Sequence, residues 1–285
     1  MLKRATLVVG LVLCGAVSST GKAIPNPPLN LDHFLCYVPA QSMVFQTFAL
    51  LKDQFDAAAD TTQPVKDLRI VRFCNPVVKI LPNGRWTPVR HWDAHLTLFQ
   101  MDPQPSTARR VFVRNQFGEQ VLQARQAETL AVPTGKVLGA TPTHLPAIPT
   151  DIDHFKCYNA SGKSVNQTVG LRDQFSPAEL LVGPNPSATV KVLAPTAFCN
   201  PVEKTRGLGA DAIVTPITNL VAHLACYAIT KPTGIPFLQN PQLLFINNQF
   251  GSGAVTVYVA DTLCVPSYKL HWSVIPPPIE EITTL

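Results

Sequence analysis

The segment from Trp86 to His95 carries the densest group of side chains that could bind or transform a ligand. If this segment is an extended strand, His91, Asp93 and His95 point to one face, because side chains alternate along a strand. Two imidazoles and a carboxylate can hold zinc or a similar ion when a fourth ligand or a water completes the site. We expect no metal and no cofactor, and keep His91, Asp93 and His95 as the alternative metal site.

The same segment also suits ligand binding without catalysis. Tryptophan rings can stack on a sugar or a peptide, and polar neighbours can orient it. The candidate binding residues are Trp86, Arg90, His91, Trp92 and Asp93. An exposed polar loop without a ligand is the competing interpretation.

The sequence carries no familiar catalytic signature. It has no Gly-x-Ser-x-Gly elbow, no His-Glu-x-x-His helix, no phosphate-binding glycine loop and no dinucleotide fingerprint. We therefore expect no catalytic residues and favour a non-enzymatic protein. The alternative is an exported hydrolase or metal-dependent enzyme that uses the segment from Trp86 to His95.

This segment lies within a pattern that occurs four times along the chain. The pattern starts with His-x-x-Cys-Tyr, continues to Asp-Gln-Phe or Asn-Gln-Phe, and closes with Cys-x-Pro-x-x-Lys. Copies one to four span residues 33–79, 95–136, 154–204 and 223–269. A fold needs the same hydrogen bond in every unit, whereas chemistry seldom needs four equivalent groups, so the recurring polar residues receive scaffold roles. They include His33, His95, His154, His223, Lys79, Lys136, Lys204 and Lys269.

Copy two alone lacks both cysteines of the pattern and has Leu98 and Ala131 in their places. If a cysteine bonded outside its own copy, this double loss would leave a partner unpaired elsewhere. The repeats therefore predict one disulfide inside each of the other copies, with buried free thiols as the alternative. The predicted pairs are Cys36–Cys74, Cys157–Cys199 and Cys226–Cys264.

Each copy carries three strand signals and no helix-period stretch of useful length. Copy one resembles copy three, and copy two resembles copy four, which indicates a duplicated half inside a duplicated domain. We predict an all-β fold of two tandem antiparallel domains, each a sandwich or barrel of two three-stranded halves held by disulfides. A four-bladed propeller is the second choice.

The expected boundaries follow from the repeats and from local composition. We place a signal peptide at 1–23, a first β domain at 24–139, a Pro- and Thr-rich linker at 140–150, a second β domain at 151–270 and a C-terminal tail at 271–285. Lys3 and Arg4 precede an apolar run that is too short for a permanent membrane span, which is typical of a signal peptide. A retained membrane anchor is the alternative.

Export would place the mature chain outside the cell, in the periplasm or at the cell surface. Cleavage after Ala23 removes Lys3, Arg4 and Lys22 and lowers the formal net charge of +5 by three. No stripe of Lys and Arg remains, so a nucleic-acid partner is not expected. No later stretch is apolar enough for a stable transmembrane anchor. The expected partner is an unidentified extracellular or envelope ligand.

The combination of Asp-His-Phe-x-Cys-Tyr, Asp-Gln-Phe and Cys-Asn-Pro-Val-x-Lys resembles a domain of unknown function from secreted proteins of environmental bacteria, often found in tandem. The resemblance covers residues 32–136 and 153–269. It implies export and repetition, and it assigns no activity and no catalytic or binding residue.

Overall fold

The structure is a computed structural model that describes residues 29–41, 43–58, 61–102, 107–139, 142–176, 185–207, 209–234 and 241–276. Within these residues nearly all regular structure is β-strand, which confirms the predicted all-β, disulfide-linked class. Each copy supplies its three expected strands. No helix in the described part of the chain has the length and apolar character needed to cross a membrane. The predicted signal peptide lies outside the described residues.

Each copy and the short elements that follow it have clear bounds. Copy one contains β1 (His33–Pro39), β2 (Val44–Lys52), α1 (Gln54–Ala57) and β3 (Gln63–Ile80), and is followed by β4 (Trp86–Thr87). Copy two contains β5 (His95–Gln100), β6 (Arg109–Asn115) and β7 (Gly118–Leu138). Copy three contains β8 (Phe155–Gly162), β9 (Gln167–Asp173), β10 (Ala188–Pro201) and β11 (Glu203–Arg206), and is followed by the 3₁₀ turn η2 (Gly209–Asp211) and β12 (Ile213–Thr215). Copy four contains β13 (His223–Ile229), β14 (Thr233–Gly234), β15 (Gln242–Asn248) and β16 (Gly251–Val274).

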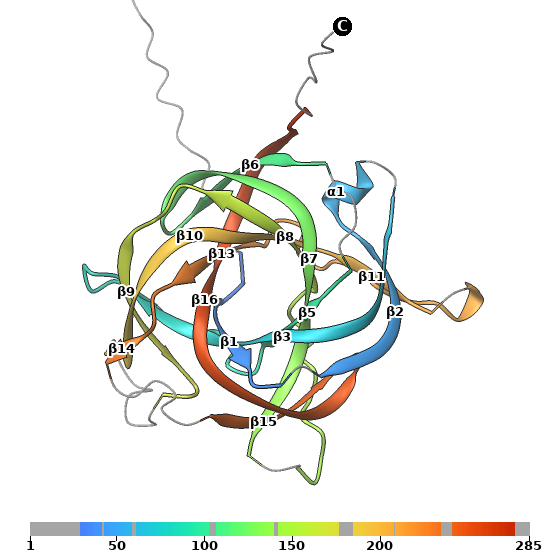
Figure 1. Cartoon of the computed structure of the whole chain (residues 1–285), viewed down its shortest axis with the longest axis horizontal. Helices are drawn as coiled ribbons and strands as arrows, with labels where there is room; N and C mark the ends of the chain where they lie inside the picture. Colours follow the sequence, from blue (N-terminus) through green and yellow to red (C-terminus); the bar gives the residue numbers. More distant parts are fainter. Residues whose placement is uncertain are drawn as a thin grey trace, which may run out of the picture.

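The first and third strands of the four copies form a closed ring of eight antiparallel strands. The order around the ring is β1, β3, β5, β7, β8, β10, β13 and β16, and β16 pairs with β1 to close it. Each first strand therefore pairs with the third strand of its own copy and with that of the preceding copy. Figure 1 looks down this ring. The ring is a single closed barrel to which all four copies contribute two strands each.

Apolar side chains and disulfides fill the ring. Along β1, Phe34 and Cys36 belong to the interior cluster, whereas Leu35 and Tyr37 belong to a larger core outside the ring. This is the alternation expected of a strand. All three predicted disulfides are confirmed, and each joins two residues that face each other across neighbouring ring strands: Cys36–Cys74, Cys157–Cys199 and Cys226–Cys264.

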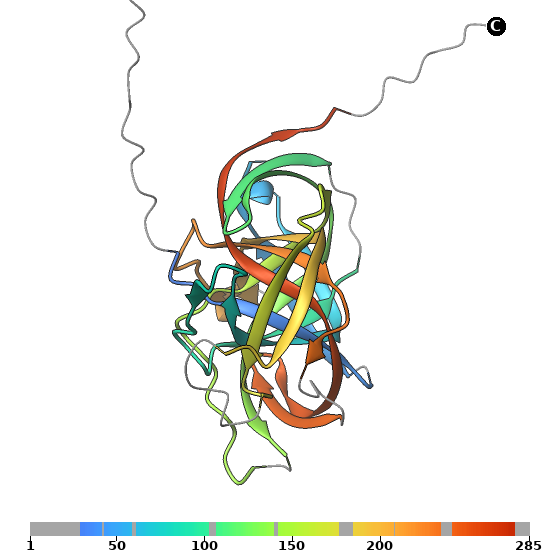
Figure 2. The same cartoon turned by 90° about the vertical axis from the view of Figure 1, so that its left-hand side faces the viewer.

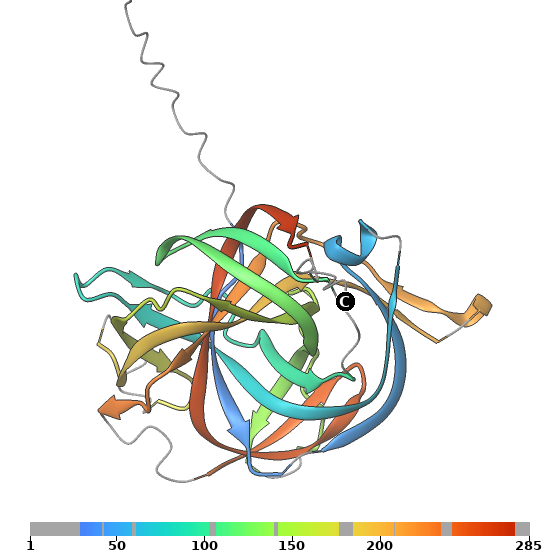
Figure 3. The same cartoon turned by 45° about the horizontal axis from the view of Figure 1, so that its top comes forward.

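Each third strand extends beyond the ring and pairs with second strands outside it. Its first part pairs with the second strand of its own copy, as β3 does with β2. Its last part, or β11 in copy three, pairs with the second strand of the copy two places away. These pairs are β3 with β9, β7 with β15, β16 with β6 and β11 with β2. Figure 2 shows β16 running the length of the molecule, and Figure 3 shows the β11–β12 hairpin projecting beyond β2.

These pairings join the two halves of the chain in a single sheet rather than in two separate sheets. A division into 24–139 and 151–270 would remove the partner strands from the ends of β3, β7 and β16. The repeats could not reveal this, because equivalent strand edges in different copies look alike in the sequence. Residues 271–274, expected in the tail, continue β16 as far as Val274. The described residues of 140–150 contain no strand, as expected for a linker.

Candidate functional site at one end of the ring

Four β-bulges shape one end of the ring. In each third strand one extra residue, three positions before the cysteine or before Ala131, interrupts the pairing register. The extra residues are Val71, Glu128, Thr196 and Asp261. A bulge bends its strand and redirects the side chain of the extra residue. Glu128 therefore lines the ring end beside its neighbour Thr129, and Asp261 does so beside Thr262.

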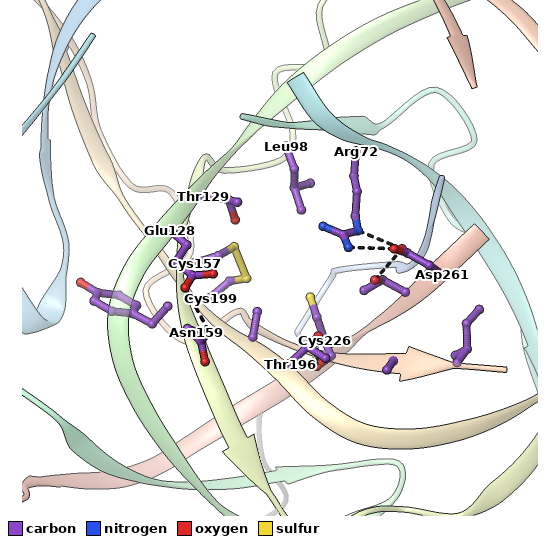
Figure 4. A pocket seen from close by; sticks show the side chains of 15 residues that line it. Arg72, Leu98, Glu128, Thr129, Cys157, Asn159, Thr196, Cys199, Cys226 and Asp261 are labelled. Atoms are coloured by element: carbon purple, nitrogen blue, oxygen red, sulfur yellow. Dashed lines mark hydrogen bonds and ion pairs between the residues drawn. A yellow bond between two sulfur atoms is a disulfide. The ribbon is translucent and has the colours of Figure 1, made fainter. Parts of the chain in front are cut away.

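These residues surround a cavity of about 440 Å³ that we call the mouth (Figure 4). The Cys157–Cys199 disulfide and Cys226 lie at its base, and Leu98 takes the corresponding place in copy two. The polar lining residues are Arg72, Glu128, Thr129, Asn159, Thr196, Asp261 and Thr262. Each of the four copies thus contributes residues to the cavity, and a disulfide bond forms part of its floor.

An ion pair spans one side of the mouth. The Nε and Nη2 atoms of Arg72 each donate to the Asp261 carboxylate at 2.8 Å, in a bidentate pair. The Thr262 hydroxyl donates to the same carboxylate at 2.8 Å. The hydrogen bond from Arg72 to Asp261 raises the pKa of the guanidinium, which keeps it charged. Both side chains are about one-third exposed, so they can still contact a ligand.

A second polar pair lies across the mouth from the first (Figure 4). The Asn159 amide of β8 donates to the Glu128 carboxylate of β7 at 2.9 Å. The Thr196 hydroxyl donates to the carbonyl oxygen of Cys226 at 3.3 Å. The mouth therefore offers oriented donors and acceptors, in which Arg72 balances Asp261 and the Glu128 carboxylate is held by a neutral amide.

The segment predicted to bind a ligand lies at the other end of the ring. It precedes β5, whose first residue is His95, whereas the mouth uses Leu98 further along that strand. Of the five candidate binding residues only Trp86 lies in a strand, and Trp92 and Asp93 form a turn. Strand alternation therefore does not place His91, Asp93 and His95 on one face.

The individual side chains of this segment have separate surroundings. The Asp32 carboxylate accepts hydrogen bonds from the backbone N–H groups of Arg90 and His91, each at 2.9 Å. His91 lies 3.4 Å from the Asp151 carboxylate. His95 is buried with its ring 5.6 Å from that of Phe73. No group of three His, Cys, Asp or Glu side chains suited to a metal is found among the residues that the structure describes.

The repeated polar residues connect different copies, beginning with Asp173. Its carboxylate accepts hydrogen bonds from the Tyr37 hydroxyl (2.8 Å) and the Asn75 amide (2.9 Å), both in copy one. Lys136 of copy two donates to the Asn75 carbonyl oxygen at 3.0 Å. Burial raises the pKa of Asp173, whereas these hydrogen bonds and the Lys136 charge act to lower it. Asp173 and its partners thus form a buried junction between copies one, two and three.

Asp53 of copy one makes the equivalent contacts with copy three. Its carboxylate accepts from the Tyr158 hydroxyl and the Asn200 amide of copy three, each at 2.9 Å. Lys269 of copy four donates to Asn200 at 3.0 Å. Copies one and three therefore exchange the same pair of bonds, which fits the predicted scaffold role.

Copies two and four carry an asparagine in place of the aspartate. The Asn115 amide donates to the Tyr227 hydroxyl at 2.8 Å and to the Ser267 hydroxyl at 3.1 Å. Each repeated lysine lies over the phenylalanine of the next copy, in the pairs Lys79–Phe117, Lys136–Phe175, Lys204–Phe250 and Lys269–Phe55. Burial lowers the lysine pKa values to about 8 in copies two, three and four, and to about 7 at Lys79.

The sequence could not single out the mouth because its key residues differ in type between copies. The bulge residues Val71, Glu128, Thr196 and Asp261 share a position but no chemistry, so no motif marks them. Of these four, Glu128, Thr196 and Asp261 line the mouth. The one available signal was their constant distance of three residues from the cysteine position.

The fold defines a class of closed β-repeat proteins in which disulfide-linked units share one sheet. The mouth lies at one end of the ring that these units form. The chain belongs to the family described as "Repeat of unknown function (DUF7450)", which matches residues 95–266. This range runs from the first histidine of copy two to the repeated proline of copy four. No curated protein and no solved structure matches the chain.

Proposed function

We propose that this protein is an exported, non-enzymatic binding module that holds a neutral polyhydroxylated ligand, such as a saccharide, in the mouth. One observation carries the proposal: the polar groups of the mouth are already oriented by hydrogen bonds above a disulfide floor. A preorganised site loses little conformational freedom when a ligand binds. Such a site suits a ligand of low intrinsic affinity.

The chemistry of the lining favours hydroxyl groups over ions. Arg72 is balanced by Asp261, so this side of the mouth offers donors and acceptors without a net charge. Threonine hydroxyls can donate and accept, as sugar hydroxyls do. Leu98 and Ile229 supply apolar surface for the C–H face of a sugar ring.

The carboxylates of the mouth have structural partners, which supports binding rather than hydrolysis. Asp261 is held by Arg72 and Thr262, and Glu128 is held by Asn159. A nucleophile needs an open approach to the substrate, and both carboxylates are engaged by neighbouring donors instead. The exported hydrolase remains the competing function, and the same experiment separates the two.

Calorimetric titration of the oxidised protein with maltotriose, cellotriose and chitotriose tests the proposal. We expect at least one trisaccharide to bind, and Arg72→Ala to weaken its binding by roughly tenfold through loss of one charged hydrogen-bonding group. Arg69→Ala is the matched control, because Arg69 lies on the same strand and is exposed outside the mouth. Absence of binding by all three sugars, or equal binding by the Arg72→Ala protein, would contradict the proposal. Release of shorter sugars on incubation would favour the hydrolase.

Export rests on different observations and has its own test. Three buried disulfides persist best in an oxidising compartment, and Lys3 and Arg4 precede an apolar run typical of a signal peptide. We expect the protein recovered from the periplasm or the medium to begin between residues 19 and 24 by amino-terminal sequencing. A protein that keeps its first residues and stays with the cytoplasm would contradict export.

A further inference from the structure

A second cavity, of about 330 Å³, lies at the junction of copies one, two and four. We call it the junction cavity. Its walls come from the residues before β1, the loop after β4, the end of β6 and the end of β16. Among its polar lining residues are Arg90, Arg114, Gln116 and His33. Its apolar lining includes Leu29, Leu31 and Pro266.

Two buried polar atoms beside this cavity have no hydrogen-bond partner within the described residues. They are Nε2 of His33, which lines the cavity, and Nζ of Lys79, whose side chain is fully buried. In copy three the matching lysine, Lys204, contacts His154 at 3.1 Å and donates to Gln249. Buried polar groups are almost always paired, so two neighbouring exceptions point to a missing partner.

The orphaned lysine results from substitutions in other copies. Lys136 donates to Asn75 and Lys269 donates to Asn200, whereas Val265 occupies the corresponding position facing Lys79. Gln116, the counterpart of Gln249, donates to the Thr87 hydroxyl at 3.0 Å and is also hydrogen-bonded to the His33 side chain. Among the described residues the Lys79 ammonium therefore has no hydrogen-bond acceptor, although it lies over the ring of Phe117.

The equivalent place in the second half of the chain is filled by the chain itself. There Asn247 faces Gly135 across the β15–β7 pair, and the Asn247 amide donates to the carbonyl oxygen of Pro146 at 2.9 Å. A Cβ atom at Gly135 would collide with the carbonyl oxygen of Ala147. The linker thus packs directly on the glycine.

At the junction cavity the same pair of positions holds Arg114 and Tyr268. The Tyr268 side chain excludes the packing seen at Gly135, and Arg114 replaces the amide that holds the linker. Arg90 likewise replaces Thr218 of copy four. The two halves therefore differ by a cavity and two added guanidinium groups at one location.

We propose that the junction cavity binds a small amphiphilic carboxylate. Arg90 and Arg114 at the surface hold the carboxylate, and Leu29, Leu31 and Pro266 contact the apolar chain. Arg114 also binds Glu119 at 2.6 Å, but its guanidinium keeps donors for a second carboxylate. Asp32, the lining carboxylate, is occupied by the N–H groups of Arg90 and His91. Lys79 adds positive charge from behind His33, and charge near a site favours an anion even without contact.

Calorimetric titration of the full oxidised chain with octanoate tests this assignment, with octanamide as the uncharged control ligand. We expect one octanoate per chain and binding of octanamide that is weaker by roughly tenfold or more, which corresponds to loss of one charged contact. Arg114→Gln should weaken octanoate binding by roughly the same factor and leave octanamide binding unchanged. Arg110→Gln is the matched control, since Arg110 is exposed on the same strand and does not line the cavity.

Three results would overturn the assignment: no octanoate binding, equal binding of octanamide, or equal effects of Arg114→Gln and Arg110→Gln. Because Arg114 is on the surface, its substitution should leave the fold intact, and a melting curve checks this. Arg90→Gln on the opposite wall provides an independent variant with the same expected loss. Binding of trisaccharides in the mouth should be unaffected by either substitution, so the two sites can fail separately.

Discussion

The buried lysines Lys136 and Lys79 occupy the same backbone arrangement in different copies, but the polar groups around them differ. Lys136 lies near the Asp173 carboxylate and donates to Asn75. Lys79 faces Asn115 and Val265 in the equivalent positions and has no hydrogen-bond partner among the described residues. The comparison shows that a repeat can keep its fold while losing the polar partners of one copy. Such a copy is where a new ligand can be accommodated.

The largest expected effect comes from breaking the charged junction. Asp173→Ala would leave Tyr37 and Asn75 buried without their shared acceptor and would remove the negative charge near Lys136. We expect a loss of about 3–5 kcal/mol in the free energy of unfolding. Asn115→Ala at the neutral junction removes only uncharged bonds and should cost about 1–3 kcal/mol. Urea unfolding of both oxidised variants at pH 7 measures the difference. Equal losses in the free energy of unfolding would show that the charge of Asp173 contributes no more to stability than the uncharged bonds of Asn115.

The second prediction tests the same comparison by replacing the lysine instead of its partner. Burial lowers the pKa of Lys79 to about 7, so the unfolded chain, with a pKa near 10.5, binds more protons between these values. Stability therefore rises with pH across this window, and the penalty of the buried charge is complete below pH 7. We expect Lys79→Met to raise stability by roughly 3 kcal/mol at pH 6 and by much less near pH 10.

The control for this prediction is Lys136→Met, which removes a lysine that has hydrogen-bond partners. It should destabilise the protein at pH 6, because Asn75 and Asp173 lose a buried donor and a charge. Urea unfolding at several pH values distinguishes the two variants. A loss of stability in the Lys79→Met protein at pH 6 would contradict the view that this ammonium is uncompensated.

A smaller effect concerns the copy without a disulfide. Leu98 and Ala131 face each other in the register that the cysteines occupy in the other copies. The double substitution Leu98→Cys/Ala131→Cys should therefore form a fourth disulfide and add about 2–3 kcal/mol to stability. Thiol titration and thermal unfolding check this against Leu98→Cys alone, which should destabilise the core. Two free thiols in the double variant would contradict the equivalence of the four copies.

The smallest effect on stability is expected at the mouth. Arg72 and Asp261 are partly exposed, and a surface ion pair contributes about 1 kcal/mol or less. Arg72→Ala should therefore shift the unfolding midpoint slightly while it weakens saccharide binding. A large loss of stability would mean that this pair serves the ring itself rather than a ligand.

The sequence predicted local features well and distant ones poorly. Three strands per copy, the three disulfides and the opposite faces of Cys36 and Tyr37 all follow from short-range spacing, and the structure confirms them. The pairing of β3 with β9 does not follow, because an edge in copy three looks the same as an edge in copy one. The bulge at Asp261 was equally invisible, since one extra residue changes the direction of a side chain without leaving a motif.

The candidate sites divide in the same way. Arg90 belongs to the segment from Trp86 to His95, which the sequence indicates by its dense group of polar and aromatic side chains, and it lines the junction cavity. His91, Asp93 and His95 were grouped by assuming an extended strand, and the turn at Trp92 removes the basis for that grouping.

The pairing of β1 with β16 also has a kinetic consequence. Cys36 and Cys264 lie 4.0 Å apart at their sulfur atoms but 228 residues apart in the sequence. The ring cannot close until nearly the whole chain is available, and contacts between such distant residues fold slowly. A nascent chain of this protein would therefore stay open during synthesis. That delay suits the export proposed above, in which the chain crosses a membrane channel unfolded and forms its disulfides afterwards.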